Sequence, residues 1–259
     1  MTPERKTPLI SKIARIRKEP KIIGRGLETR PKGHITSFKV ESDELASYTE
    51  KPLRSEKAAR ETLEMYQQLN LLGLPVVSFL KIIQKQEKST GQNQYSVAME
   101  DLSAHDKNLV LMMGDTTENP DNPANKLDSQ ELLEKAKNTE ELIDQMARAL
   151  AVLHNNGIYE FHNKLSFFLV ASRSAIGEKS ERPTLDFKIL DYSNFTNDGS
   201  ENSSVQDTLS DNVPGFKHGI ERNLEYLKKA IGETLRKKLE EKYKKYREER
   251  LMAYTFSAK

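Results

Sequence analysis

The chain has 259 residues, of which 36% are hydrophobic and 31% charged, and its formal net charge is only +2. This composition is typical of a soluble protein that forms one bilobal unit or two ordinary domains. Because the chain has no cysteine, disulfide bonds, cysteine-based metal sites and a cysteine nucleophile are excluded. No apolar run approaches the length that a membrane-spanning helix needs.

The small net charge hides an uneven distribution. Basic residues crowd both ends of the chain, at 5–21 and 228–250, and acidic residues concentrate around 115–141. An anionic membrane surface would suit the basic ends, although solvated faces are the commoner explanation, and no specific nucleic acid is expected. Since residues 1–20 lack the continuous apolar segment of a secretory signal, we expect a cytoplasmic protein, with peripheral attachment to the inner face of a membrane as the alternative.

A period-two pattern predicts a meander of three strands, at 21–26, 34–40 and 45–51. Gly24 and Gly26 form a Gly-x-Gly pair in the first of them. Glycines let backbone N–H groups approach a phosphate without an intervening side chain, so the pair is a candidate nucleotide-covering loop. An ordinary hairpin or bulge is the alternative interpretation.

A strong amphipathic helix is predicted over residues 55–72, and Gly73 ends it. The next predicted elements, in chain order, are a hairpin of 79–84 with 95–99, a turn-rich loop over 115–129 and a second amphipathic helix over 140–154. His154 stands at the end of that second helix, and we interpret it as a residue hydrogen-bonded near the core.

The most informative stretch covers residues 149–194. Asn156 and Gly157 close the helix that contains its start. The predicted elements after them are a strand at 158–160, a polar loop, a strand at 168–170 and a strand at 188–190 that ends on Asp191.

The rest of the chain divides into a polar segment and a basic one. Residues 196–212 are rich in Asn, Ser, Asp and Gly, which predicts disorder. Residues 220–246 carry apolar side chains at three- and four-residue spacing among Lys and Arg, which predicts one long amphipathic helix. We expect its apolar stripe to pack inward; contact with acidic phospholipid headgroups is the alternative.

The order of elements around Asp191 resembles the protein-kinase-like superfamily, and within it the branch of lipopolysaccharide core (Kdo/heptose) kinases and aminoglycoside phosphotransferases. In the first of these groups the catalytic loop reads roughly D-L-Y-x-x-H-F-L-L, and the stretch HNKLSFFLV at 162–170 aligns with it without a gap. His162 then stands at the position of the catalytic aspartate, and Phe167 at that of the metal-binding Asn or His. The triplet that starts at Asp191 keeps the aspartate of the D-F-G-like motif.

The resemblance implies an α+β, bilobal, protein-kinase-like fold with a small antiparallel β lobe containing one helix and a mainly helical C-terminal lobe. The implied divisions are a basic N-terminal arm at 1–20, an N-lobe at 21–99, a C-lobe at 100–219 with a disordered loop near 196–212, and a basic amphipathic helix and tail at 220–259.

The resemblance also implies a role for particular residues. Lys51 would pair with Glu61 and grip the nucleotide phosphates, together with Gly24 and Gly26. Met99, Glu100 and Leu102 would form the hinge that receives the adenine ring. Asp191 would hold Mg²⁺, so ATP and magnesium are the implied cofactors. His162 would be the impaired group at the catalytic position.

These departures favour a pseudokinase with weak or no phosphotransfer that acts as a nucleotide- or partner-binding regulator or scaffold. One alternative is an active ATP-dependent kinase of a lipopolysaccharide core sugar or another small hydroxylated substrate, in which His162 accepts the proton. A second alternative is a basic adaptor associated with a membrane or a nucleic acid. The partners to test are therefore ATP, lipopolysaccharide core, an anionic membrane surface and a protein.

Overall fold

A computed structural model describes the chain over residues 21–25, 38–41, 48–86, 91–103, 108–119, 122–160, 165–172, 176, 182–197 and 214–254. The chain forms two compact units, one of residues 1–64 with 77–105 and the other of residues 65–76 with 106–259. The predicted arm at 1–20 and most of the polar segment at 196–212 lie outside the described residues. The described part is α+β, with antiparallel sheets.

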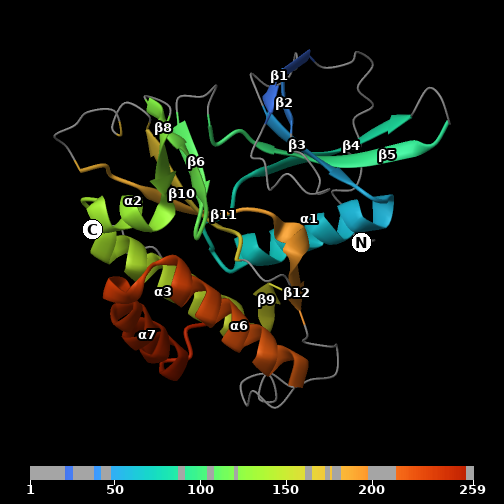
Figure 1. Ribbon diagram of the computed structural model, residues 1–259. Helices are drawn as coiled ribbons and strands as arrows, with labels where there is room; N and C mark the ends of the chain where they lie inside the picture. The colour runs from blue at the N-terminus through green and yellow to red at the C-terminus, as the bar shows by residue number, and fades with distance from the viewer. Residues whose placement is uncertain are drawn as a thin grey trace, which may run out of the picture. The chain divides into compact units, whose positions relative to one another are not determined.

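The first unit contains a five-stranded antiparallel sheet (Figure 1). In spatial order its strands are β1 (Lys21–Arg25), β2 (Phe38–Glu41), β3 (Tyr48–Leu53), β5 (Asn93–Glu100) and β4 (Phe79–Gln86). The predicted meander and the predicted hairpin are confirmed as elements, and β3 joins them because it pairs with β5 along its whole length.

Helix α1 (Glu56–Leu71) confirms the helix predicted over 55–72. Ser55 caps its start, since the backbone N–H of Ala58 donates to Ser55 Oγ at 3.1 Å. Its first half belongs to the first unit and its last two turns to the second. In the first unit, the hydroxyl of Tyr95 on β5 donates to Glu56 Oε2 at 3.2 Å and ties the helix to the sheet.

The second unit contains three small antiparallel sheets and four of the described helices. The main sheet has the order β11 (Asp186–Ile189), β10 (Phe167–Ser172), β6 (Asn108–Met112). Strand β9 (Ile158–Glu160) pairs with β12 (Phe195–Asn197). The predicted strands before and after the polar loop are confirmed, whereas β6 and β12 were not predicted.

The turn-rich loop predicted over 115–129 is wrong. Strands β7 (Thr116–Asn119) and β8 (Asn122–Asp128) form a hairpin, and α2 (Ser129–Lys135) follows. The segment lacks an apolar alternation, so only the backbone pairing of Thr117 with Leu127 and its neighbours reveals the strands. Asp128 then caps α2, because its Oδ1 accepts the N–H of Gln130 at 2.7 Å.

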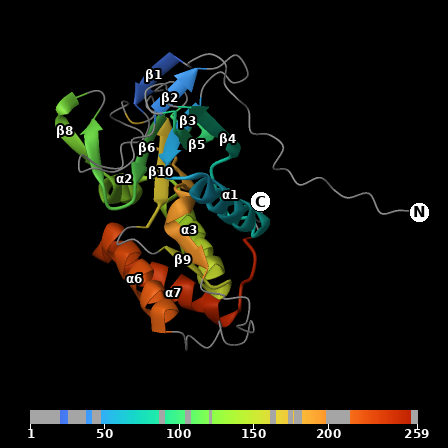
Figure 2. The same cartoon turned by 90° about the vertical axis from the view of Figure 1, so that its right-hand side faces the viewer.

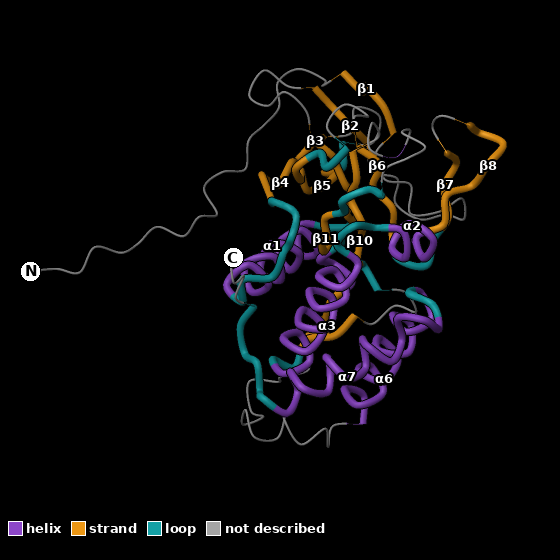
Figure 3. Tube along the Cα trace, turned by 90° about the vertical axis from the view of Figure 1, so that its left-hand side faces the viewer, coloured by secondary structure: helices purple, strands orange, loops and turns teal. Residues whose placement is uncertain are grey.

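Helices α3 (Thr139–Asn155), α6 (Pro214–Ala230) and α7 (Glu233–Glu248) form the helical part of this unit, with α7 alongside α3 (Figures 2 and 3). The single helix predicted over 220–246 is wrong, because the chain turns at Gly232. Gly232 has φ +79°, and a Cβ there would lie 2.2 Å from Gln130 Nε2. The positive φ is what requires glycine at this turn, since the flexible amide of Gln130 could move away from a Cβ.

The expectation that the apolar stripe of this region packs inward is confirmed. Four residues of α7 are buried at three- and four-residue spacing: Leu235, Leu239, Tyr243 and Tyr246. They face α3, which is buried at every position from Ala149 to Asn155. No helix in the described part of the chain is long and apolar enough to span a bilayer.

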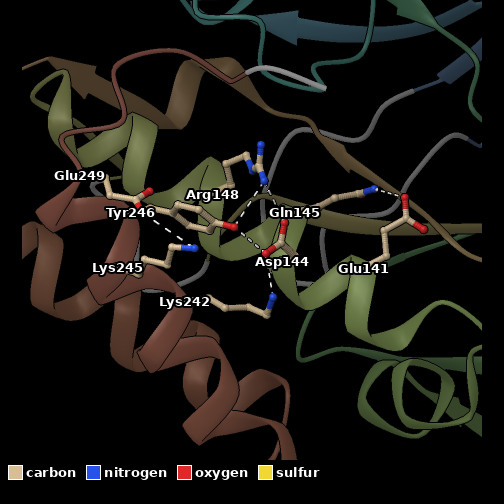
Figure 4. Close-up of polar contacts among 8 residues, drawn as sticks. All are labelled: Glu141, Asp144, Gln145, Arg148, Lys242, Lys245, Tyr246 and Glu249. Carbon is tan, nitrogen blue, oxygen red and sulfur yellow. Dashed lines mark hydrogen bonds and ion pairs between the residues drawn. The ribbon is translucent and has the colours of Figure 1, made fainter. Parts of the chain in front are cut away.

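A half-buried polar seam locks α7 onto α3 (Figure 4). Asp144 Oδ1 accepts hydrogen bonds from Tyr246 Oη at 2.6 Å and from Lys242 Nζ at 2.8 Å. Arg148 Nη2 lies 3.2 Å from Asp144 Oδ2. Burial raises the pKa of Asp144, but the hydrogen bonds from Lys242 and Tyr246 and the positive charges of Lys242 and Arg148 outweigh burial, so the pKa is lowered overall.

We predict that Asp144→Asn lowers the free energy of unfolding by about 1–2 kcal/mol, because the seam loses charge-assisted hydrogen bonds. Urea unfolding measures this loss. Glu140→Gln is the matched control, since Glu140 pairs with Lys238 across the same two helices but is 65% exposed. The control should change the free energy by less than about 0.5 kcal/mol. Equal losses in both variants would contradict a special role for the seam.

His154 lies at the end of α3, fully buried, with Nδ1 2.7 Å from Tyr243 Oη of α7. The interpretation of His154 as a hydrogen-bonded core residue is thus confirmed. Burial, with the nearby positive charge of Arg247, lowers its pKa from 6.5 to about 3. The folded chain therefore holds this imidazole neutral where the unfolded chain would protonate it.

We predict that the stability of the protein falls as the pH decreases below 6.5, by up to about 1.4 kcal/mol per pH unit from this residue, until the folded imidazole also titrates. The lower end of this window lies near pH 3. Chemical unfolding at several pH values between 4.5 and 7 measures the slope. The slope should decrease by this amount in His154→Asn, and an unchanged slope would refute the assignment.

Candidate functional site

The sheet register of the first unit aligns residues that the sequence assigned to nucleotide binding. Gly24 pairs with Lys39, Lys39 with Thr49, and Thr49 with Met99, so these positions form one row across four strands. Directly paired residues lie on the same face of a sheet, and so do residues two apart in a strand. Lys51, two residues after Thr49, therefore shares this face with Gly24 and Met99.

Lys51 is only 9% exposed, and Thr49 and Met99 are buried beside it. Tyr95 lies on the same face, at even spacing from Met99, and its hydroxyl reaches Glu56 of α1. The buried Lys51 thus lies on the face of the sheet that α1 packs against. A lysine this buried is uncommon unless its ammonium group is paired.

Glu61, the predicted partner of Lys51, lies on the exposed side of α1. Its carboxylate is 3.6 Å from Lys57 Nζ, one helical turn earlier, and its side chain is 60% exposed. The buried positions in this part of α1 are Ala59 and Thr62. The Lys51–Glu61 ion pair stays a prediction.

The predicted hinge begins with the last two residues of β5. Met99 is buried, Leu102 is half-buried and Glu100 is exposed. The backbone N–H of Glu100 donates to the carbonyl of Ser78 at 3.0 Å, and Ser78 Oγ donates back to Glu100 Oε2 at 2.9 Å. An adenine ring would therefore have to use other backbone groups of the hinge. Gly26, the second glycine of the predicted phosphate loop, lies outside the described residues.

In the second unit, a buried carboxylate holds together the two ends of the predicted catalytic loop. Glu160, the last residue of β9, is 1% exposed. One of its carboxylate oxygens accepts the backbone N–H of Ser166, and the other accepts Ser166 Oγ at 2.7 Å. His162 belongs to the loop between them and lies outside the described residues, so its role stays a prediction.

Helix α6 fixes the backbone of Glu160. Asn223 Oδ1 accepts the Glu160 N–H at 2.9 Å, and Asn223 Nδ2 donates to the Glu160 carbonyl at 2.9 Å. Arg222 Nη2 donates to the same carbonyl at 3.1 Å. Sequence reasoning missed Glu160, although an acidic residue in the otherwise apolar run Ile158-Tyr159-Glu160-Phe161 is a signal of a buried, satisfied carboxylate.

Asp191 is linked to the same loop through Ser166. The N–H of Leu190 donates to the Ser166 carbonyl at 3.1 Å, and Asn194 Nδ2 donates to Ser166 Oγ at 3.4 Å. Asp191 itself has left-handed backbone angles, φ 64° and ψ 48°. Such angles are uncommon for residues other than glycine and often accompany functional positions. Its side chain is half-buried, and Ser193 Oγ donates to Oδ1 at 3.2 Å.

Phe167, at the position of the second metal ligand, is a core residue. It is fully buried and packs edge-on against Phe187, with 4.8 Å between ring centroids. Its backbone pairs with Ile189, two residues before Asp191. The described residues contain no cluster of three or more histidine, aspartate or glutamate side chains that could hold a metal ion.

No family model and no curated protein matches the chain. Among solved structures, WaaP in complex with acyl carrier protein is similar at 14% sequence identity and a TM-score of 0.36, over 88% of this chain and 89% of that chain.

We predict that Glu160→Ala lowers the free energy of unfolding by about 2–3 kcal/mol, because it leaves the buried N–H of Ser166 without its acceptor. Glu160→Gln, which keeps one acceptor oxygen, should cost less. The measurement is urea unfolding, with Glu221→Ala on the exposed side of α6 as a control that changes stability by less than about 0.5 kcal/mol. If Glu160→Ala is as stable as the wild type, the Glu160 carboxylate does not hold the loop ends together through Ser166.

Proposed function

We propose that this chain is a bilobal, protein-kinase-like protein that binds a nucleotide or a protein partner as a regulator or scaffold, with phosphotransfer that is weak or absent. The kinase assignment rests on the order of elements and on the resemblance of residues 162–170 and Asp191 to the superfamily motifs. The local geometry of each unit supports it, through the shared face of Lys51 and Met99 and through the Ser166 link to Asp191.

The burial of Phe167 is the main observation that supports weak or absent phosphotransfer. A phosphotransferase uses carboxylate and amide ligands to hold metal ions that spread the charge of the transferring phosphoryl group. At this position the chain has a benzyl side chain packed into the core, which cannot bind a cation. Asp191 alone would then hold Mg²⁺.

The loss of the loop aspartate would also slow phosphoryl transfer. General-base groups of this kind contribute about 10²- to 10⁴-fold in rate. With His162 at that position and a single metal ligand, both orientation of the acceptor and neutralisation of charge are impaired. If ATP binds, Gly24, Lys51 and the hinge after Met99 are the residues proposed to hold it, with Asp191 on the metal.

The alternative of an active sugar kinase rests on His162, because a histidine can accept the proton of the acceptor hydroxyl near neutral pH. The membrane alternative receives no support from α7, because its apolar stripe is buried against α3 rather than exposed. The exposed side of α7 also mixes Lys237 and Lys244 with Glu241 and Glu248.

We predict weak ATP binding that depends on Mg²⁺ and on Asp191, and no appreciable phosphate transfer to sugars or lipopolysaccharide core. Calorimetric titration with ATP, with and without Mg²⁺, measures the first, and a transfer assay the second. Asp191→Ala should abolish the magnesium-dependent part of binding. Asp186→Ala is the control, because it removes an exposed carboxylate from β11, the strand that precedes Asp191.

Two results would overturn parts of this proposal. Binding of MgATP that is unchanged in Asp191→Ala would refute the metal role of Asp191. Robust turnover that is lost in His162→Ala would show that His162 is the base and would favour the active sugar kinase.

A further inference from the structure

Residues 251–254, which we call the C-terminal strap, run from the end of α7 to the end of α1 (Figure 2). All the groups that they contact in the bonds below belong to the second unit. Tyr254 is only 6% exposed, so its side chain anchors the strap against the second unit.

The end of α7 sets the direction in which the strap leaves the helix. Arg250 has φ 52°, its N–H donates to the Arg247 carbonyl at 3.1 Å, and the Leu251 N–H donates to the Tyr246 carbonyl at 3.1 Å. This pair of bonds is a Schellman motif, which normally has glycine at the left-handed position. Arginine adopts that conformation here, and the chain therefore turns sharply back across α3.

The end of α3 binds the strap backbone. Asn155 Nδ2 donates to the Leu251 carbonyl at 2.9 Å, and Asn156 Nδ2 donates to the Met252 carbonyl at 2.9 Å. Arg247 Nη1 donates to Asn155 Oδ1 at 2.7 Å, which fixes the orientation of that amide. Two successive asparagines thus bind two successive carbonyls of the strap.

The far end of the strap binds α1. The carbonyls at the end of a helix have no partner within it, and the Tyr254 N–H donates to the carbonyl of Leu72, the residue that follows α1, at 2.7 Å. Gly73 follows with φ +73°, and a Cβ at that position would lie 2.5 Å from the Tyr254 carbonyl oxygen. Glycine is therefore required for the strap to lie on the helix end.

The segment after α1 leads from the strap to the candidate metal ligand. The Ile189 N–H donates to the Pro75 carbonyl at 2.9 Å, and Val76 forms a parallel bridge with Ile189. Ile189 precedes Asp191 by two residues. A continuous path of backbone hydrogen bonds and short peptide segments therefore joins the strap to the Asp191 turn.

We propose that the C-terminal strap is a tether that sets the position of Asp191 through the end of α1, so that its attachment or release changes the affinity of the protein for magnesium-bound nucleotide. The affinity step rests on the proposed function, whereas the mechanical link does not. Release of the strap removes the Leu72 bond first and then loosens the Pro75–Ile189 contact.

The test compares full-length variants by amide hydrogen exchange. Tyr254→Ala removes the buried anchor, and Gly73→Ala forces a methyl group against the strap, so the two variants release the same contact from opposite sides. Asn156→Ala is a milder release for the case in which either variant fails to fold. Met252→Ala is the matched control, because its side chain is 39% exposed and the strap uses only its carbonyl.

We expect amide exchange at residues 72–76 and at Ile189 to accelerate at least about tenfold in the release variants. Exchange in α2 should keep its wild-type rate in these variants, and the control Met252→Ala should keep wild-type rates at all these positions. MgATP affinity, measured by calorimetry, should fall at least about fivefold. If exchange accelerates at residues 72–76 but stays at the wild-type rate at Ile189, the tether is refuted. If exchange accelerates at Ile189 while the MgATP affinity is unchanged, the regulatory role of the tether is refuted. Accelerated exchange in a protein whose wild type binds no MgATP would support the mechanical link and refute the nucleotide function.

Discussion

The burial of α3 is the constraint on which the second unit depends. A helix with so little exposed surface must satisfy the polar groups at its end without water, and the cost of leaving one unsatisfied is high. Nδ1 of His154 does so with Tyr243, and the amides of Asn155 and Asn156 do so with the strap carbonyls. The position of α7 and the path of the C-terminal strap both follow from the end of this helix.

Each unit also contains a buried carboxylate that a serine satisfies. In the first unit Glu50 accepts Ser96 Oγ at 2.5 Å and Lys85 Nζ at 2.8 Å, across three strands. In the second, Glu160 accepts both donors of Ser166. Both carboxylates are committed to the fold, so they join distant segments rather than offering free ligands. Asp191 differs from them because it is half-buried and has a strained backbone.

The candidate functional residues consequently fall into two groups with separate supports. Gly24, Lys51 and Met99 depend on the register of one sheet, since a shift of one residue would move Lys51 to the opposite face. Asp191 depends on Ser166 and on the contact between Ile189 and Pro75. A nucleotide function requires both groups, and either could be lost while the other remained intact.

The sequence by itself determined the elements whose pattern is local. The helices that became α1 and α3, the β4–β5 hairpin and the strands that lead to Asp191 each follow from periodicity and a stop signal within about 20 residues. Only the tertiary structure decided the break at Gly232, the burial of Glu160, the exposure of Glu61 and the course of the strap. The burial of Glu160 and the course of the strap depend on partners far along the chain, Asn223 and Leu72, and local propensity carries no information about such contacts.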